Sequence, residues 1–133
     1  MSTTPEGKRN GLSQTPSRSS ASVKVFWLDR PKTLSRIREA VKDLINRHPE
    51  IEQAVLFGSL ARGDAAPGSD ADLLLILRES DLPFLARSAR YFLTEAGIGV
   101  DIFAYTRSEL DAMLAGGNTF VAQALREGIV LEG

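Results

Sequence analysis

Three aspartates in the second half of the chain have the spacing of a site for divalent cations. Asp70 and Asp72 open a segment, 70–77, whose apolar run predicts a central strand. Residues two apart on a strand point to the same face, about 6.6 Å apart at a rise of about 3.3 Å per residue, so these carboxylates are expected to be neighbours. Asp101 is the one acid of the next apolar segment, 100–105, and joins them if the two strands pair in a suitable register.

Carboxylates on strands rich in Leu, Ile and Val need a counter-charge. Half-burying each ion is costly unless a cation compensates it, and neither strand segment contains Lys or Arg. The chain has no cysteine and one histidine, His48, so metal ligands must come mainly from its 17 acidic residues, whose oxygens favour magnesium, calcium or manganese. Two such ions about 3.5–4 Å apart can activate an attacking oxygen and stabilise a leaving oxygen in phosphoryl or nucleotidyl transfer.

A glycine–serine pair precedes these acids. Gly58 and Ser59 stand between a predicted strand, 51–57, and a short predicted helical turn, 59–62. Backbone N–H groups at a helix N-terminus, together with a serine hydroxyl, bind phosphate oxygens. The simpler interpretation is a turn with an N-cap, but the Asp-x-Asp pair that begins at Asp70 favours a phosphate site.

Other interpretations of this region are weaker or stay open. Arg62 and Asp64 also fit a local salt bridge beside the C-cap Gly63. Gly58 and Gly63 have the spacing of a Walker A loop, but Asp64 occupies the lysine position. The segment 97–99 lacks the third glycine of a dinucleotide-binding loop.

The combined motif resembles that of the minimal nucleotidyltransferases, a small bacterial and archaeal branch of the DNA polymerase beta-like superfamily. It consists of Gly58-Ser59-x-x-Arg62-Gly63, then Ser69-Asp70-x-Asp72-Leu73, then the lone Asp101 on a later strand. The resemblance covers residues from about 23 to 133. It implies an α+β (α/β) fold in which a small mixed sheet of four or five strands is flanked by helices.

The resemblance also implies a role for each motif residue. Gly58 and Ser59 would hold a nucleoside triphosphate. The first two aspartates would bind two magnesium ions, with manganese as a substitute, and Asp101 would complete the metal site and assist deprotonation of the acceptor. Ser69 would buttress the metal loop, whereas Arg62 would either contact phosphate or fix the loop.

Members of this family transfer a nucleoside monophosphate, often AMP from ATP, to a hydroxyl of a protein or small molecule and release pyrophosphate. Many resemble antitoxins that pair with a helical HEPN partner, so a toxin–antitoxin role is expected as an alternative, either by modification or by contact alone. A nucleotide-sensing domain without turnover is a third hypothesis. Because 133 residues leave no room for an acceptor-binding domain, a partner protein or self-association is expected to complete the cleft.

The rest of the chain is predicted from composition and periodicity. Residues 1–22 are rich in Ser, Thr, Pro and Gly and predict a disordered tail, followed by one domain, 23–133. Further predictions are a strand at 23–28, a helix capped by Thr33 that ends before Pro49, and a helix from Pro83 towards Gly97. The last are a helix capped by Thr106 that runs through Leu114, a helix at 120–125 and a strand at 129–131.

Composition excludes several classes of function. The net charge of −1 gives no reason to expect nucleic-acid binding, and no apolar run approaches the 18 residues that a membrane span needs. We therefore expect a cytoplasmic protein. Its aromatic residues, Trp27, Tyr91, Phe103 and Tyr105 among them, are predicted to pack in the core, with stacking on a base as the alternative.

Overall fold

The computed structural model describes residues 29–65, 68–93 and 96–132. The predicted tail at 1–22 and the predicted strand at 23–28 lie outside the described residues. In chain order the described elements are α2 (Arg30–Arg47), β1 (Ile51–Phe57), α3 (Ser59–Arg62), β2 (Ala71–Leu77), α4 (Phe84–Arg90), β3 (Val100–Thr106), α5 (Arg107–Ala115), α6 (Thr119–Glu127) and β4 (Ile129–Glu132).

The four strands form one mixed sheet in the order β3-β2-β1-β4. Strands β2 and β3 are parallel, whereas β1 is antiparallel to both of its neighbours. A parallel pair needs a crossover connection, and α4 lies in the chain between β2 and β3. The predicted small mixed sheet flanked by helices is confirmed.

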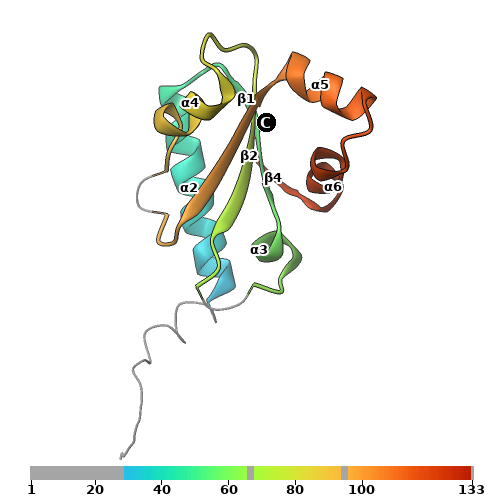
Figure 1. The fold of residues 1–133 in the computed structure, drawn as a ribbon. Coiled ribbons are helices and arrows are strands. Elements are labelled where there is room, and N and C mark those ends of the chain that lie inside the picture. Colours follow the sequence, from blue (N-terminus) through green and yellow to red (C-terminus); the bar gives the residue numbers. More distant parts are fainter. Residues whose placement is uncertain (1–28, 66–67, 94–95, 133) are drawn as a thin grey trace, which may run out of the picture. The chain divides into compact units, whose positions relative to one another are not determined.

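Apolar side chains cover both faces of the sheet. Successive residues of β2 alternate between two buried layers: Leu73 and Leu75 belong to the layer with α2, and Leu74 and Ile76 to the layer with α5 and α6. Figure 1 shows α2 on one side of the sheet and α5 and α6 on the other. Strand β2 is therefore central and buried on both faces, as its continuous apolar run predicted.

Two predicted helix boundaries were wrong. Helix α2 begins at Arg30, because Pro31 is tolerated in a first turn, and Thr33 is a buried residue inside the helix rather than its N-cap. Helix α4 ends at Arg90 and does not continue towards Gly97. Tyr91 leaves the helix with an extended backbone, and its buried hydroxyl donates a hydrogen bond to Glu50. Tertiary burial of this ring thus ends the helix early.

The later helices begin at their predicted positions or within one residue of them. Thr106 caps α5 in a capping box with Glu109, and the Asn118 side chain accepts a hydrogen bond from the Val121 N–H at the start of α6. None of the helices in the described part of the chain has the length and apolarity that crossing a bilayer requires.

An ion pair between a buried arginine and a half-exposed glutamate joins α4 to α5 beside β3. The Arg87 side chain is 4% exposed, and its guanidinium donates to both carboxylate oxygens of Glu109, at 2.6 and 3.0 Å. It also donates to the backbone carbonyls of Leu82 and Ala104. Four acceptors for one guanidinium compensate the cost of burying its charge.

Candidate active site

The predicted aspartates lie where strands of the sheet begin and end, at a place that we call the acidic edge. It consists of Asp70, Asp72 and Asp101. Strand β1 ends there at Phe57, whose Cα pairs with that of Asp72, and β2 and β3 begin there. In the parallel β2–β3 pair, Asp72 and Asp101 are direct register partners. Partners in register project to the same face, so position 101 lies on the same side of the sheet as position 72.

The charges of Asp70 and Asp101 act on the carboxylate of Asp72. Burial raises the pKa of Asp72, and the negative charges of Asp101 and Asp70 raise it further, while Arg62 acts in the opposite direction. Asp72 is half-buried, whereas Asp70 and Asp101 are exposed. The acidic edge is therefore a site of like-charge repulsion that a cation would relieve.

Two glycines make room for two of these carboxylates. A Cβ on Gly58 would overlap Oδ2 of Asp72, and a Cβ on Gly99 would overlap Oδ1 of Asp70. Gly58 also has φ of +79°, which non-glycine residues rarely adopt, and this turn leads the chain from β1 into α3. The backbone of the neighbouring loops thus approaches the acidic edge as closely as a glycine allows.

The donor set fits a divalent cation by its chemistry. Carboxylate oxygens are the ligands that magnesium and manganese prefer, and three lie within electrostatic reach here. Among the described residues, 29–65, 68–93 and 96–132, no three acidic or histidine side chains lie close enough together to hold a metal ion. The carboxylates of the acidic edge are thus neighbours rather than a finished coordination shell.

Ser59 and Ser69 lie close in sequence to the acidic edge. Ser59 is the first residue of α3, directly after the turn at Gly58, and Ser69 is a half-buried residue directly before Asp70. The one-turn helix is closed by Gly63 with a left-handed backbone, as predicted. Both serines therefore flank the place where β1 ends and β2 begins.

Arg62 is paired with carboxylates. Its guanidinium lies 3.3 Å from Asp64 and 3.2 Å from Glu127, and these two partners raise its pKa. The local salt bridge with Asp64, left open by the sequence, is present. The contact with Glu127, at the end of α6, ties the α3 turn to a helix 65 residues further along the chain.

Sequence reasoning missed three residues that the fold brings to this region: Gly99, Glu127 and Phe120. Gly99 had a signal, because it belongs to a Gly-x-Gly segment, but that pattern indicates a dinucleotide-binding loop and not a contact with an aspartate. Glu127 and Phe120 lie on α6, far along the sequence, and no local pattern links them to the aspartates.

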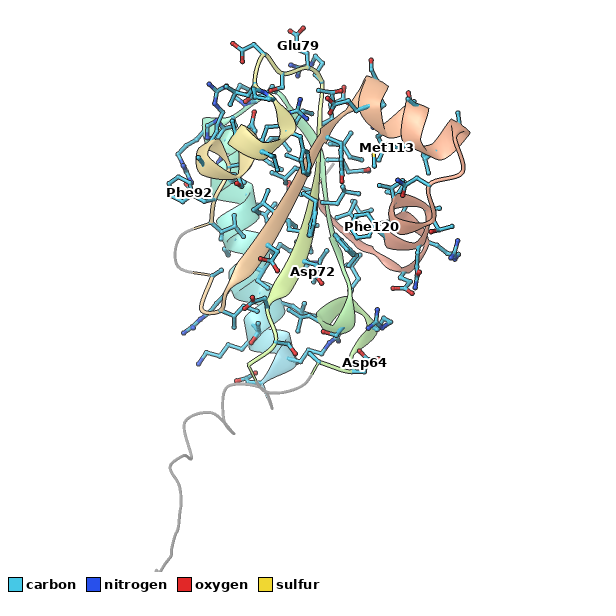
Figure 2. The ribbon with its side chains drawn as sticks, viewed as in Figure 1. Asp64, Asp72, Glu79, Phe92, Met113 and Phe120 are labelled. Atoms are coloured by element: carbon cyan, nitrogen blue, oxygen red, sulfur yellow. The ribbon has the colours of Figure 1, made fainter. Side chains whose placement is uncertain are left out.

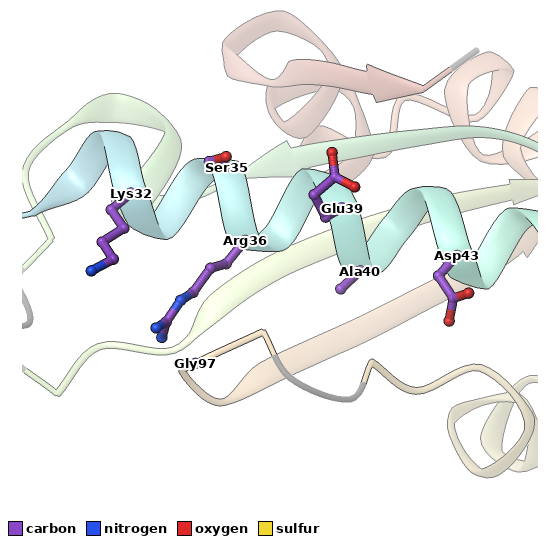
Figure 3. A pocket seen from close by; sticks show the side chains of 7 residues that line it. All are labelled: Lys32, Ser35, Arg36, Glu39, Ala40, Asp43 and Gly97. Carbon is purple, nitrogen blue, oxygen red and sulfur yellow. The ribbon is translucent and has the colours of Figure 1, made fainter.

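A hollow of about 780 Å³ lies elsewhere, along the exposed face of α2 (Figure 3). Its lining mixes both signs of charge and is formed by Lys32, Ser35, Arg36, Glu39, Ala40, Asp43 and Gly97. None of the predicted site residues lines it. We place the candidate site at the acidic edge, because carboxylates held together against their repulsion mark function better than an open hollow does.

The four-stranded mixed sheet with flanking helices is the fold of the polymerase beta-like nucleotidyltransferases. The family model described as nucleotidyltransferase domain matches residues 34–128, and the chain therefore belongs to this family. The predicted family and fold are confirmed.

One solved structure agrees on the fold. A protein from Sulfolobus solfataricus, provisionally named as a nucleotidyltransferase, is similar with a TM-score of 0.50 at 23% sequence identity, and the match covers 71% of this chain and 83% of that one. A toxin–antitoxin structure with AMP-PNP has a TM-score of 0.45 and 19% identity, covering 72% and 73% of the two chains. No curated protein matches this chain.

Proposed function

We propose that the protein is a magnesium-dependent nucleotidyltransferase that moves a nucleoside monophosphate, AMP when ATP is the donor, onto a hydroxyl of a protein or small molecule. Membership of the nucleotidyltransferase domain family supports the class of reaction. The observation that carries the proposal is the direct pairing of Asp72 with Asp101, with Asp70 in electrostatic reach, beside the turn at Gly58.

Each site residue has a stated task in this proposal. Asp70, Asp72 and Asp101 hold two magnesium ions, or manganese, which when bound supply the positive charge that attracts the phosphate oxygens and offsets the repulsion among the carboxylates. Gly58 and Ser59 offer backbone N–H groups and a hydroxyl to the phosphates.

The transfer itself breaks one bond and forms one. The acceptor oxygen attacks the α-phosphorus and gives its proton to the carboxylate of Asp101. The bond between the α-phosphorus and the oxygen that bridges to the β-phosphorus breaks, and pyrophosphate leaves with that oxygen. Asp101 suits this task because it is exposed and lies next to Asp72 in register.

Arg62 and Ser69 support the loops in this proposal. Because Arg62 is engaged by Asp64 and Glu127, we assign it to fixing the α3 turn rather than to contacting phosphate. Ser69, directly before Asp70, buttresses the loop that leads into β2.

The test is transfer of label. The protein is incubated with α-³²P-labelled ATP, GTP, CTP or UTP and magnesium in a lysate of the source cell, and the labelled molecule is identified. We expect label on a protein or small molecule, lost with EDTA and in Asp70→Asn and Asp72→Asn. The matched control is Asp43→Asn, an exposed aspartate on α2 that forms an ion pair with Arg47. Label that persists in both site variants would overturn the proposal.

A second candidate function is binding of a partner protein, such as a HEPN-type toxin, by contact alone. Exposed apolar side chains on and after α4 favour it, since Leu85 is 87% and Phe92 is 52% exposed. If contact alone neutralises the partner, Asp70→Asn and Asp72→Asn leave neutralisation intact and Leu85→Glu abolishes it. A nucleotide sensor would instead bind ATP without releasing pyrophosphate.

A further inference from the structure

We propose that Phe120 of α6 supplies the surface on which the base of the nucleoside triphosphate stacks. This inference rests on the proposed function, because it concerns the part of the substrate that the acidic edge does not contact. Carboxylates, cations and a glycine–serine turn account for the phosphates, and the base needs a flat apolar partner within reach of them.

Three phenylalanines, the aromatic trio, pack together on the α5–α6 face of the sheet: Phe57 of β1, Phe103 of β3 and Phe120. The ring centroid of Phe120 lies 5.6 Å from that of Phe57 and 5.4 Å from that of Phe103, and the remaining pair is 5.6 Å apart. The Phe57–Phe120 contact is edge-on, with an interplanar angle of 84°. The ring of Phe120 is thus held in one orientation by two neighbours.

The aromatic trio adjoins the acidic edge. Phe57 is the Cα partner of Asp72 across β1 and β2, and direct partners place their side chains side by side on one face. Phe103 follows Asp101 by two residues on β3, about 6.6 Å along the same face. Figure 2 shows Phe120 between α6 and the strands, and its ring contacts Phe57, the register partner of Asp72.

Exposure singles out Phe120 among the three rings. Phe57 is 7% exposed and serves the core, whereas Phe120 is 43% exposed even though it packs against two aromatic partners. A ring that is fixed on one side and open on the other, next to a charged phosphate site, can stack a planar base without losing much conformational entropy.

A second aromatic pair lies too far from the acids to serve the same nucleotide. Phe84 and Tyr105 are stacked on each other with centroids 4.9 Å apart. Tyr105 follows Asp101 by four residues on β3, about 13 Å along the strand. Each ring of that pair already covers a face of the other.

Stacking also predicts which substrates bind better. Every base has an aromatic face, so a platform of this kind discriminates weakly among bases, but purines offer a larger face than pyrimidines. We therefore expect ATP and GTP to bind more tightly than CTP and UTP, and inorganic tripolyphosphate to bind without any contribution from Phe120.

The experiment measures dissociation constants for ATP and for tripolyphosphate by calorimetry, both with magnesium, on the full chain. For Phe120→Ala we expect the ATP constant to rise about 10-fold, with the tripolyphosphate constant unchanged. Phe120→Leu keeps an apolar side chain without a ring and should resemble Phe120→Ala, while Phe120→Tyr should restore ATP affinity. Thermal unfolding of each variant identifies any that fail to fold, and Phe120→Tyr and Phe120→Leu then decide the question.

The matched control is Phe92→Ala, since Phe92 is also an exposed phenylalanine but lies away from Asp72 (Figure 2); its ATP affinity should equal that of the unaltered protein. If Phe120→Leu binds ATP as tightly as the unaltered protein, or loses affinity for ATP and tripolyphosphate equally, the inference is wrong and the proposed function is unaffected. If the unaltered protein binds neither compound, the proposed function falls and the inference falls with it.

Discussion

Asp72 shows at the scale of one residue how a site can oppose stability. Burial and two neighbouring negative charges raise its pKa, which means that the folded protein disfavours the ionised form. A pKa raised by folding contributes stability only at low pH, and that contribution is lost as the pH rises through the folded-state value. At neutral pH the ionised carboxylate therefore destabilises the fold.

We predict that Asp72→Asn stabilises the protein in the absence of divalent cations, by about 1 kcal/mol at pH 7, and abolishes nucleotidyl transfer. The amide keeps the shape of the side chain without its charge. Urea unfolding in EDTA measures the stability. Asp43→Asn, which loses only an exposed ion pair with Arg47 at 3.3 Å, should change it by less than about 0.5 kcal/mol. A loss of stability in Asp72→Asn would contradict this account.

Gly99 offers a second test at this scale, because its backbone is not in the left-handed region and a Cβ there meets chiefly the carboxylate of Asp70. We predict that Gly99→Ala turns this carboxylate aside and lowers transfer activity at least about 10-fold, since misplacing a catalytic group by 1 Å costs about 100-fold. Thermal unfolding should shift little.

The control for Gly99→Ala is Gly116→Ala, at the C-terminus of α5, where the nearest atom to a Cβ is the Ala112 carbonyl oxygen at 3.3 Å. This variant should keep full activity. If Gly99→Ala were as active as the unaltered protein, the glycine would not position Asp70.

The aspartates and the glycine–serine pair of the candidate site could be proposed from sequence because each signal is local. Residues at i and i+2 on a strand must share a face, and an acid alone in an apolar run is conspicuous. Gly99 could not be assigned in this way, since its role depends on where the Asp70 side chain turns. The pairing of Arg62 with Glu127 likewise depends on the packing of α6 near α3.

At the scale of elements, the strands were predicted more accurately than the helix ends. The bounds 51–57 agree with β1 because a glycine and a proline-containing turn enclose an apolar run. Helix ends were predicted wrongly where residues distant in sequence determine them. The ring of Tyr91 packs edge-on against His48, with centroids 5.0 Å apart, and α4 therefore ends before Tyr91. The order and register of the strands could not be predicted from local sequence patterns either, because strands of this composition can pair in several ways.

The ion pair that links α4 to α5 predicts a pH dependence. Hydrogen bonds from Arg87 lower the pKa of Glu109 from 4.5 to about 2. A lowered pKa contributes stability that is present above pH 4.5 and is lost as the pH falls towards 2. We predict that Glu109→Gln lowers the free energy of unfolding at pH 7 by about 2 kcal/mol, because the buried guanidinium loses its charged acceptor.

Urea unfolding at a series of pH values checks this prediction. The difference between the unaltered protein and Glu109→Gln should shrink as the pH falls from 4.5 to 2. The control is Glu52→Gln, whose ion pair with Arg107 at 3.3 Å lies at the surface and should contribute little at any pH. A difference that stays constant across this range would show that the charge of Glu109 is not what stabilises the pair.

At the scale of the whole molecule, the mixed sheet brings the site together. The parallel β2–β3 pair aligns Asp72 with Asp101, and the antiparallel β1 delivers Gly58 to the same edge. Reversing either direction would carry one of these groups to the far end of the sheet. The site is therefore a property of the topology, and its charge should couple cation binding to the stability of the entire domain.

This coupling gives a prediction for the intact chain. Magnesium with a non-hydrolysable triphosphate, each at about 100 times its dissociation constant, should stabilise the fold by about 2.7 kcal/mol and raise the Tm by about 10 °C. Magnesium alone should raise the Tm less, and EDTA should reverse the shift.

The double variant Asp70→Asn, Asp72→Asn should start with a higher Tm and show no shift, because it lacks both the repulsion and the ligands. Sodium chloride at matched ionic strength separates this effect from screening. An equal shift in the double variant would place cation binding away from the acidic edge, and the assignment of the aspartates as ligands would then be wrong.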